Sequence, residues 1–243
     1  MSVRVQSSKL FDNGEREGFV PDFPEHRIAI LRMKRGQNRI NIEFIEVFNE
    51  CLDKIEQKSD CRGLLTTGEG KFYSNGLDLD WLSKQDAEGR DNFTLALSRL
   101  LTRLLTFPIP TIAAINGHAY AGGALLALAH DFRVMNSEKG WFCMNEVHIS
   151  LRFNAFFLAL LRAKISTKIV EHRLLVFGHN YTAKEAVEAA LVDRSTSAAL
   201  LESESLRFLE RWIGKNGFQQ DSLHNMKQDV YAEVVKLVNS SKL

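Results

Sequence analysis

Two glycine-bearing turns and one carboxylate downstream of them are the groups in this sequence best suited to chemistry. The turns are residues 70–79 (GKFYSNGLDL) and residues 116–123 (NGHAYAGG), and the carboxylate is Glu146. Backbone N–H groups presented by such turns can stabilise an oxygen on which negative charge develops, and a carboxylate can act as a general base. This combination predicts chemistry that passes through an enolate, as reactions next to a thioester carbonyl do.

Each turn offers one candidate N–H donor. Gly122 follows a predicted strand and opens a run of small and apolar residues, 121–130, that predicts a buried helix. The N–H groups at a helix start have no partner within the helix and carry its positive dipole end. Asn75 follows another strand in the same manner and supplies the second donor. The alternative is that Gly122 and Gly123 only allow a helix to pack closely on a strand.

The rest of the sequence supplies the elements that must position these turns. Apolar residues at helical spacing predict helices at 41–58 and 91–106, and a helical pattern from about residue 153 to the end. Asp78 is predicted to cap a helix, and residues 182–185 have the form of a capping box. Alternating strands and helices followed by helices predict an α/β fold with a helical C-terminal part. Short apolar runs predict the strands, at 27–33, 62–67, 111–115, 132–135 and 141–144.

The composition argues against several classes of partner. With 31 basic and 30 acidic residues the net charge is +1, so no strong field would attract nucleic acid or an anionic membrane. No apolar run approaches the roughly 18 residues of a membrane-spanning helix, and we expect no membrane insertion. Cys51, Cys61 and Cys143 lack the spacing of metal ligands, and we expect no metal site.

The last three residues, Ser241, Lys242 and Leu243, form the tripeptide that peroxisomal import receptors read. The tripeptide acts only when it is free and terminal, as it is in this sequence. We therefore expect the peroxisome as the location and its import receptor as a partner.

The two turns resemble segments of the enoyl-CoA hydratase/isomerase (crotonase) superfamily. Residues 70–79 resemble its GxxFSxGxDL segment, and residues 110–123 (PTIAAINGHAYAGG) resemble its PxIAAxxGxAxGG segment. The resemblance implies a crotonase-like spiral of ββα units at 26–180, after a flexible lead-in at 1–25 and before a helical region at 181–243. It also implies a homotrimer or homohexamer that binds acyl-CoA, with no separate cofactor because coenzyme A is part of the substrate.

The same resemblance assigns roles to particular residues. The oxyanion hole maps onto the backbone N–H groups of Asn75 and Gly122, with asparagine in place of the usual alanine. Hydratases of the superfamily use two glutamates, and the first of these positions is Leu125 here. The second position is Glu146, which matches the acid of the Δ3,Δ2-enoyl-CoA isomerases. Because one carboxylate can take a proton from C2 and return it to C4, the expected activity is isomerisation of 3-enoyl-CoA in β-oxidation.

The pocket around Glu146 is expected to be apolar. Leu79, Leu125, Leu126 and Asn145 are predicted to line it, and the leucines would keep water away from the enolate. Burial should raise the pKa of Glu146 towards neutral pH. For coenzyme A, the resemblance points to cations after the first strand and on the last helix, namely Arg32, Lys34, Arg35 and Lys227.

Several alternatives remain open from the sequence. Arg152 could pair with Glu146 and lower its pKa, and Ser150 departs from the glycine-rich run that often follows the acid. These departures, with Asn75, allow a non-catalytic acyl-CoA-binding homologue, and the scaffold also allows another enoyl-CoA or dienoyl-CoA reaction. Glu146 and His148 could form two ligands of a metal, although no third ligand is in view.

Overall fold

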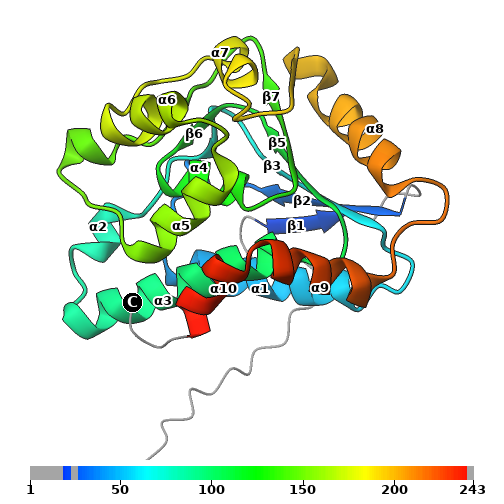
Figure 1. The fold of residues 1–243 in the computed structure, drawn as a ribbon, viewed down its shortest axis with the longest axis horizontal. Coiled ribbons are helices and arrows are strands. Elements are labelled where there is room, and N and C mark those ends of the chain that lie inside the picture. Colours follow the sequence, from blue (N-terminus) through cyan, green and yellow to red (C-terminus); the bar gives the residue numbers. More distant parts are fainter. Residues whose placement is uncertain (1–18, 23–26, 240–243) are drawn as a thin grey trace, which may run out of the picture.

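The computed structural model describes residues 19–22 and 27–239 of the chain, and its core is two stacked sheets (Figure 1). The larger sheet has the order β1-β2-β3-β5-β7-β9, in which only β1 is antiparallel to its neighbour. The smaller sheet is parallel, with the order β4-β6-β8. The strands are β1 (Phe19–Asp22), β2 (Ile28–Met33), β3 (Gly63–Gly68), β4 (Phe72–Ser74), β5 (Thr111–Ile115), β6 (His118–Tyr120), β7 (Phe132–Asn136), β8 (Phe142–Cys143) and β9 (Arg194–Thr196).

The chain visits the two sheets in a repeating order. One strand of the larger sheet is followed by one strand of the smaller sheet and then by helical structure, three times in succession. The three units are β3-β4 with α2 (Leu79–Leu82) and α3 (Ala87–Leu105), β5-β6 with α4 (Gly122–Leu128), and β7-β8 with a 3-10 turn (Glu146–Ile149) and α5 (Ala155–Lys164). This arrangement confirms the predicted spiral of ββα units.

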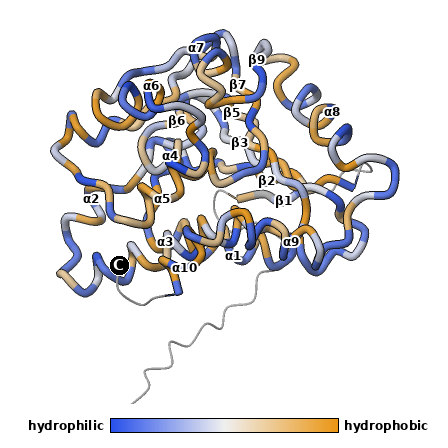
Figure 2. The backbone as a smooth tube through the Cα atoms, viewed as in Figure 1, coloured by the Kyte–Doolittle hydropathy of each residue, from blue (hydrophilic) through white to orange (hydrophobic). Residues whose placement is uncertain are grey.

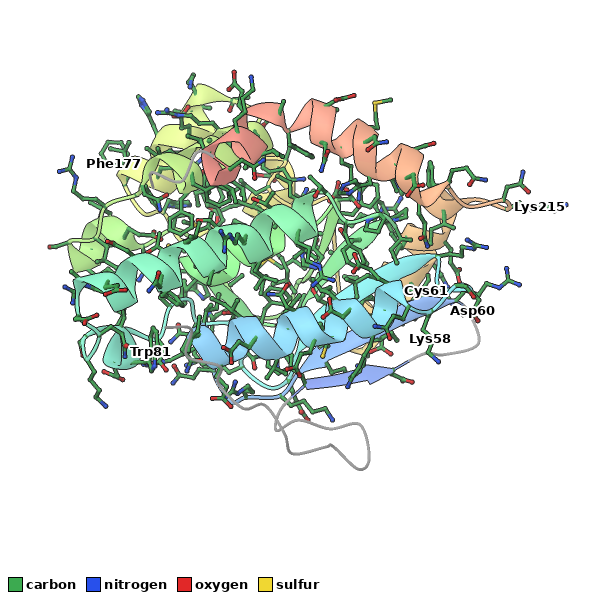
Figure 3. The ribbon with its side chains drawn as sticks, turned by 90° about the horizontal axis from the view of Figure 1, so that it is seen from below. Lys58, Asp60, Cys61, Trp81, Phe177 and Lys215 are labelled. Atoms are coloured by element: carbon green, nitrogen blue, oxygen red, sulfur yellow. The ribbon has the colours of Figure 1, made fainter. Side chains whose placement is uncertain are left out.

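The first helices begin where side chains can cap them. Asn41 accepts a hydrogen bond from the Phe44 N–H at 3.0 Å and starts α1 (Ile42–Glu56), as the sequence predicts. Helix α3 starts four residues before the predicted position, because the Asp86 carboxylate accepts from the Gly89 N–H at 2.7 Å. In Figure 3, Trp81 lies at one end of these two helices and Cys61 lies at the other. Trp81 packs on Phe93 with ring centroids 5.3 Å apart.

The C-terminal part is mostly helical, but one element was not predicted. Residues 194–196 form strand β9, which pairs with β7 at the edge of the larger sheet, so the expectation of helices alone after residue 153 is wrong here. The predicted capping box between Thr182 and Glu185 is confirmed. The helical elements are α6 (Lys168–Glu171), a π-helical turn (His172–Val176), α7 (Ala183–Glu188), a 3-10 turn (Ala198–Leu200), α8 (Leu201–Ile213), α9 (Gln220–Val230) and α10 (Ala232–Asn239).

Two of these helices close the core from opposite sides. Helix α8 packs on the larger sheet, where its Leu201 and Leu209 meet a small apolar cluster that includes Ile112 and Val134. Helix α10 packs against α3 and α5. In Figure 2 the apolar segments gather along the interior surfaces of these helices and strands. The tail after residue 239, including the predicted targeting residues 241–243, lies outside the described residues.

A chain of polar side chains crosses the apolar interior between β3 and α4. His130 is fully buried, with Nδ1 2.9 Å from the Leu126 carbonyl oxygen and Nε2 2.9 Å from Thr66 Oγ1. Thr66 Oγ1 in turn lies 2.8 Å from the Tyr73 hydroxyl. These contacts attach the helix that begins at Gly122 to the strand that leads into the first glycine turn.

Candidate active site

The two glycine turns and Glu146 meet at one cavity of about 470 Å³. Its wall is mainly apolar and is built from α2, α3, α4 and the segment between β8 and α5. The structure therefore brings together residues that are up to 118 positions apart (from Arg39 to Phe157) in the sequence. The residues lining the cavity are Arg39, Asn75, Leu77, Leu79, Leu82, Asp91, Thr94, Ala121, Gly122, Leu125, Asn145, Glu146, Ile149, Leu151, Arg152, Phe153, Asn154 and Phe157.

Of the predicted pocket residues, Leu79, Leu125 and Asn145 line the cavity, and Leu126 does not. Leu126 is completely buried in the main apolar core. Consecutive residues of a helix point about 100° apart, and with Leu125 directed at the cavity Leu126 points into the core. The prediction for Leu126 is therefore wrong, and this residue supports α4 from behind.

Gly122 lines the cavity at the start of a helix. Gly122 is the first residue of α4, and the N-cap residue, Ala121, makes no side-chain cap. The preceding Ala121 has φ 49° and ψ −117°, a conformation that residues with a side chain rarely adopt. A Cβ atom on Gly123 would lie 2.3 Å from the Ser74 carbonyl oxygen. Close packing therefore accounts for Gly123, whereas Gly122 retains the geometry of an oxyanion donor.

The second predicted donor already has an acceptor. The Asn75 N–H donates to the Gln37 carbonyl oxygen at 2.9 Å. The Asn75 side chain makes a parallel contact, since its Nδ2 donates to Gln37 Oε1 at 2.7 Å. Arg39 also donates to Gln37 Oε1, at 2.9 Å, and lines the cavity itself. Gln37 and Arg39 could not be found from the sequence, because neither belongs to a glycine turn and neither is an acid.

Glu146 has the environment of a general base. Its side chain is buried at 8% exposure, and its Oε2 atom has no hydrogen-bond partner among the described residues. Burial raises the pKa of Glu146 to about 7, which is the direction predicted. A carboxylate with such a pKa is able to take up and release a proton near neutral pH.

Arg152 does not neutralise this carboxylate. It lines the same cavity but is exposed, and it forms no ion pair with Glu146 in the described part of the chain. The structure therefore does not show the pairing that the sequence left open. Ser150 ends the 3-10 turn in the left-handed conformation, with φ 56°, and its N–H donates to the Glu146 carbonyl oxygen. The Leu151 N–H donates to the same oxygen at 3.0 Å, so the Glu146 backbone is held in place.

Comparison with known proteins places this geometry in a family, because the family model described as "Enoyl-CoA hydratase/isomerase" matches residues 24–238. The chain belongs to the enoyl-CoA hydratase/isomerase family. One relative, "Enoyl-CoA delta isomerase 2, peroxisomal" of Arabidopsis thaliana, is 39% identical over 165 residues, which cover 65% of this chain and 68% of the relative. "Enoyl-CoA delta isomerase 1, peroxisomal" of the same organism is 29% identical over 212 residues, covering 86% and 88%. The crystal structure of human mitochondrial delta3-delta2-enoyl-CoA isomerase has a TM-score of 0.82 at 22% identity, with 92% of this chain and 87% of that chain covered.

In the enoyl-CoA hydratase/isomerase family, the number of acids at the cavity bears on whether water can be activated. Leu125 stands where the resemblance places the first hydratase glutamate, and it is 2% exposed at the cavity wall. Besides Glu146, the described cavity wall has one other carboxylate, Asp91 on α3, which is solvent-exposed. Asp91 was missed because its position on a helix carries no motif.

The cations predicted to bind coenzyme A have different surroundings in this family member. Arg32 forms an ion pair with Glu202, and Arg35 forms one with Glu43 at 2.8 Å. Lys34 is exposed and lines a shallow hollow together with Lys71. Of the three cations after the first strand, Lys34 is therefore the one best able to bind a phosphate.

Lys227, which the resemblance assigns to coenzyme A, is buried. Its ammonium group donates to Asp131 Oδ2 at 2.6 Å and to the carbonyl oxygens of Phe107 and Ile109 at 3.0 and 3.3 Å. With 7% exposure and all three of its N–H bonds matched by an acceptor, this lysine has no donor left for a phosphate. Its role is to hold α9 against the ends of α3 and β5.

The remaining candidates have structural surroundings. Ser74 donates to the Asn38 carbonyl oxygen at 2.7 Å, and Asp78 caps α2 as predicted. His148 packs beside Gly178, and no group of three or more metal-ligating side chains gathers within residues 19–22 and 27–239. In the same residues, no helix has both the length and the apolar composition required to cross a membrane.

Proposed function

We propose that this protein is an isomerase that moves the double bond of 3-enoyl-CoA to give 2-trans-enoyl-CoA in fatty acid β-oxidation. The observation that carries the proposal is the single buried carboxylate of Glu146, with a free Oε2 atom, in a cavity where Leu125 replaces a second acid. The relatives named as delta isomerases support the same activity.

In the proposed mechanism, Glu146 removes a proton from C2 of the acyl chain. The electrons of the broken C–H bond form the C1–C2 double bond of a dienolate, and the negative charge moves to the thioester oxygen. The Gly122 and Asn75 N–H groups stabilise this oxygen, and one such donor contributes roughly 10²–10³ in rate. The protonated Glu146 then returns the proton to C4, which leaves the double bond between C2 and C3.

The apolar wall of the cavity determines which product these reaction steps give. Leu125 offers no group that could orient a water molecule for attack at C3, so the conjugated product leaves without being hydrated. The rise in the pKa of Glu146 towards 7 suits a group that must act as base and then as acid in one cycle.

The test is to mix the purified protein with trans-3-hexenoyl-CoA and follow the absorbance of the conjugated thioester. We expect conjugation without 3-hydroxyacyl product, and loss of about 10²–10⁴ in kcat in Glu146→Gln with acyl-CoA binding retained. Asp91→Asn is the matched control, since it neutralises the other carboxylate of the cavity and should keep most of the activity. Hydroxyacyl product from the native protein would rule out the one-acid isomerase.

A second candidate is a non-catalytic acyl-CoA-binding homologue. It is favoured by the bond from the Asn75 N–H to Gln37, which occupies one oxyanion donor. Binding of hexenoyl-CoA without any turnover, in both the native protein and Glu146→Gln, would support this candidate. A dienoyl-CoA substrate in the same assay tests for a third candidate, a dienoyl-CoA reaction that uses Asp91 as a second acid.

Location and assembly are also proposals. A peroxisomal location is suggested by the relatives whose names contain the word and by the tripeptide at residues 241–243. A fluorescent fusion that keeps these residues at its C-terminus, compared with the Leu243→Glu variant, tests import. We further propose a homotrimer or homohexamer, which light scattering of the purified protein tests directly.

A further inference from the structure

The loop after β2 is joined to the first glycine turn by consecutive hydrogen bonds. Besides the bond from Asn75 to Gln37, the Ile40 N–H donates to the Gly76 carbonyl oxygen at 2.8 Å, and the Asp78 N–H donates to the Ile40 carbonyl oxygen at 2.9 Å. Ser74 Oγ closes the other end by donating to the Asn38 carbonyl oxygen at 2.7 Å. Residues 37–40 and 74–78 therefore form one hydrogen-bonded strip, in which the Gln37 carbonyl lies opposite the Asn75 N–H.

Side-chain hydrogen bonds strengthen the contact between Gln37 and Asn75, the residue of this strip that belongs to the predicted oxyanion hole. Gln37 Oε1 accepts from Asn75 Nδ2 and from Arg39 Nε, and Arg39 is held in turn by Asp80 at 3.0 Å. On the other side, Asn38 is buried, and its Nδ2 donates to the Met33 and Tyr73 carbonyl oxygens at 3.1 and 2.9 Å. Gln37 itself is exposed, so its side chain fixes the carbonyl without being part of the core.

An acceptor already in place changes what Asn75 can do for a substrate. A neutral thioester oxygen would replace one carbonyl acceptor with another of similar strength, which yields little free energy. A dienolate oxygen is charged, and hydrogen bonds to charged acceptors are roughly twice as strong as those between neutral groups. Only the charged oxygen therefore gains by displacing the Gln37 carbonyl. Gly122, at an uncapped helix start, has no such competitor and can meet the neutral oxygen first.

We propose that Gln37 is a positioning residue that withholds the Asn75 N–H from the bound substrate and releases it to the dienolate. This inference rests on the proposed isomerase function. An interaction made only as charge develops lowers the barrier without tightening substrate binding, so it acts on kcat and leaves the ground state alone. The asparagine at position 75 is then explained as well, because its side chain provides the second bond to Gln37.

The test compares three variants with the native enzyme. Gln37→Ala removes the acceptor for Asn75 Nδ2 and Arg39 Nε, so the strip loosens and the neutral thioester gains access to the Asn75 N–H. We expect KM for trans-3-hexenoyl-CoA to fall by about 3- to 10-fold, the value of one hydrogen bond, with kcat changed by less than about 2-fold. Gln37→Glu keeps an acceptor oxygen at the same place, now on a carboxylate, and should retain the native KM. Gln57→Ala, an exposed glutamine at the end of α1, is the matched control and should change neither parameter.

A measurement that needs no turnover separates this inference from the proposed function. Saturated hexanoyl-CoA is added to the ¹⁵N-labelled protein, and the amide signals of Asn75 and Gly122 are followed. We expect the Gly122 signal to move in the native protein while the Asn75 signal stays, and both signals to move in Gln37→Ala. Movement of the Asn75 signal in the native protein would overturn the role of Gln37 even if the protein is an active isomerase. A KM that rises in Gln37→Ala would overturn it too.

Discussion

The Lys227 ammonium group lies 2.6 Å from the Asp131 carboxylate, and both side chains are largely removed from solvent. The same carboxylate oxygen accepts from the Thr111 N–H at 2.8 Å and from Thr111 Oγ1 at 3.2 Å. Burial lowers the pKa of Lys227, and Asp131 opposes this effect. The pair thus joins the C-terminal helices to the beginnings of two neighbouring core strands, β5 and β7.

Lys227→Met should therefore affect folding and leave acyl-CoA affinity alone. Removing one partner of a buried ion pair leaves an uncompensated charge and typically costs about 3–5 kcal/mol. We expect a loss of this order in the free energy of unfolding in urea, with KM unchanged at a temperature where the variant is folded. Lys236→Met, an exposed lysine on α10, is the control. A raised KM with native stability would instead restore the original expectation of a phosphate contact.

The activity should depend on pH through Glu146. The carboxyl group must be ionised to remove the C2 proton, and burial raises its pKa to about 7 in the free enzyme. We expect kcat/KM for 3-hexenoyl-CoA to rise with pH through about 7 and to fall tenfold per pH unit well below it. Constant activity down to pH 5 would show that another group is the base.

The same group should lower the stability of the fold at alkaline pH. The folded pKa lies above the ordinary value of 4.5, so the folded state binds the proton more tightly than the unfolded state does. Stability contributed by this group is therefore present below pH 4.5 and is lost as the pH rises through 7. Glu146→Gln should be more stable than the native protein at pH 8, by up to about 3 kcal/mol, and equally stable at pH 4. Urea unfolding at the two pH values measures the difference.

Leu125→Glu should introduce hydration. The variant places a second carboxylate in the wall of the cavity that Glu146 lines, and two acids can hold and activate a water molecule. We expect 3-hydroxyacyl-CoA to appear by mass spectrometry when 2-hexenoyl-CoA is supplied, at the expense of stability because a buried carboxylate is costly. Leu125→Met keeps an apolar side chain and should give no hydroxyacyl product.

Ser150→Gly should stabilise the protein. Ser150 has φ 56°, a region in which a side chain costs roughly 1–2 kcal/mol and glycine does not pay this cost. After allowance for the greater freedom of glycine when unfolded, we expect a gain of about 0.5–1 kcal/mol in thermal or urea unfolding. Ser83→Gly, at a position with φ −64°, should instead be destabilising. Loss of stability in Ser150→Gly would show that its side chain has an unrecognised contact.

The parts of the molecule that sequence could predict are those encoded locally. The helix that begins near Asn41 and the buried helix at Gly122 follow from residue types within a few positions of one another, and the ββα units are implied by the resemblance. Glu146 was found because the resemblance singled out its position. These features need no knowledge of which distant segments meet.

The parts that could not be predicted depend on contacts between distant segments. Gln37 meets Asn75 through a backbone carbonyl, which leaves no mark on the choice of side chain. Lys227 looks like a surface lysine until Asp131, 96 positions away, is known to face it. Strand β9 has only three residues, two of them exposed, so it lacks the alternating pattern by which strands are identified.

The buried chain from Tyr73 to Leu126 has only one possible polarity. A carbonyl oxygen can only accept, so the imidazole hydrogen must be on Nδ1 of His130, facing Leu126. Nε2 then has a lone pair that accepts the Thr66 hydroxyl hydrogen, and the Thr66 oxygen accepts from the Tyr73 hydroxyl. Adding a proton to Nε2 would require the Thr66 hydroxyl to turn its hydrogen away, in an interior that already lowers the pKa of this imidazole. His130 is thereby fixed as one neutral tautomer, and it remains uncharged over the pH range in which Glu146 changes charge.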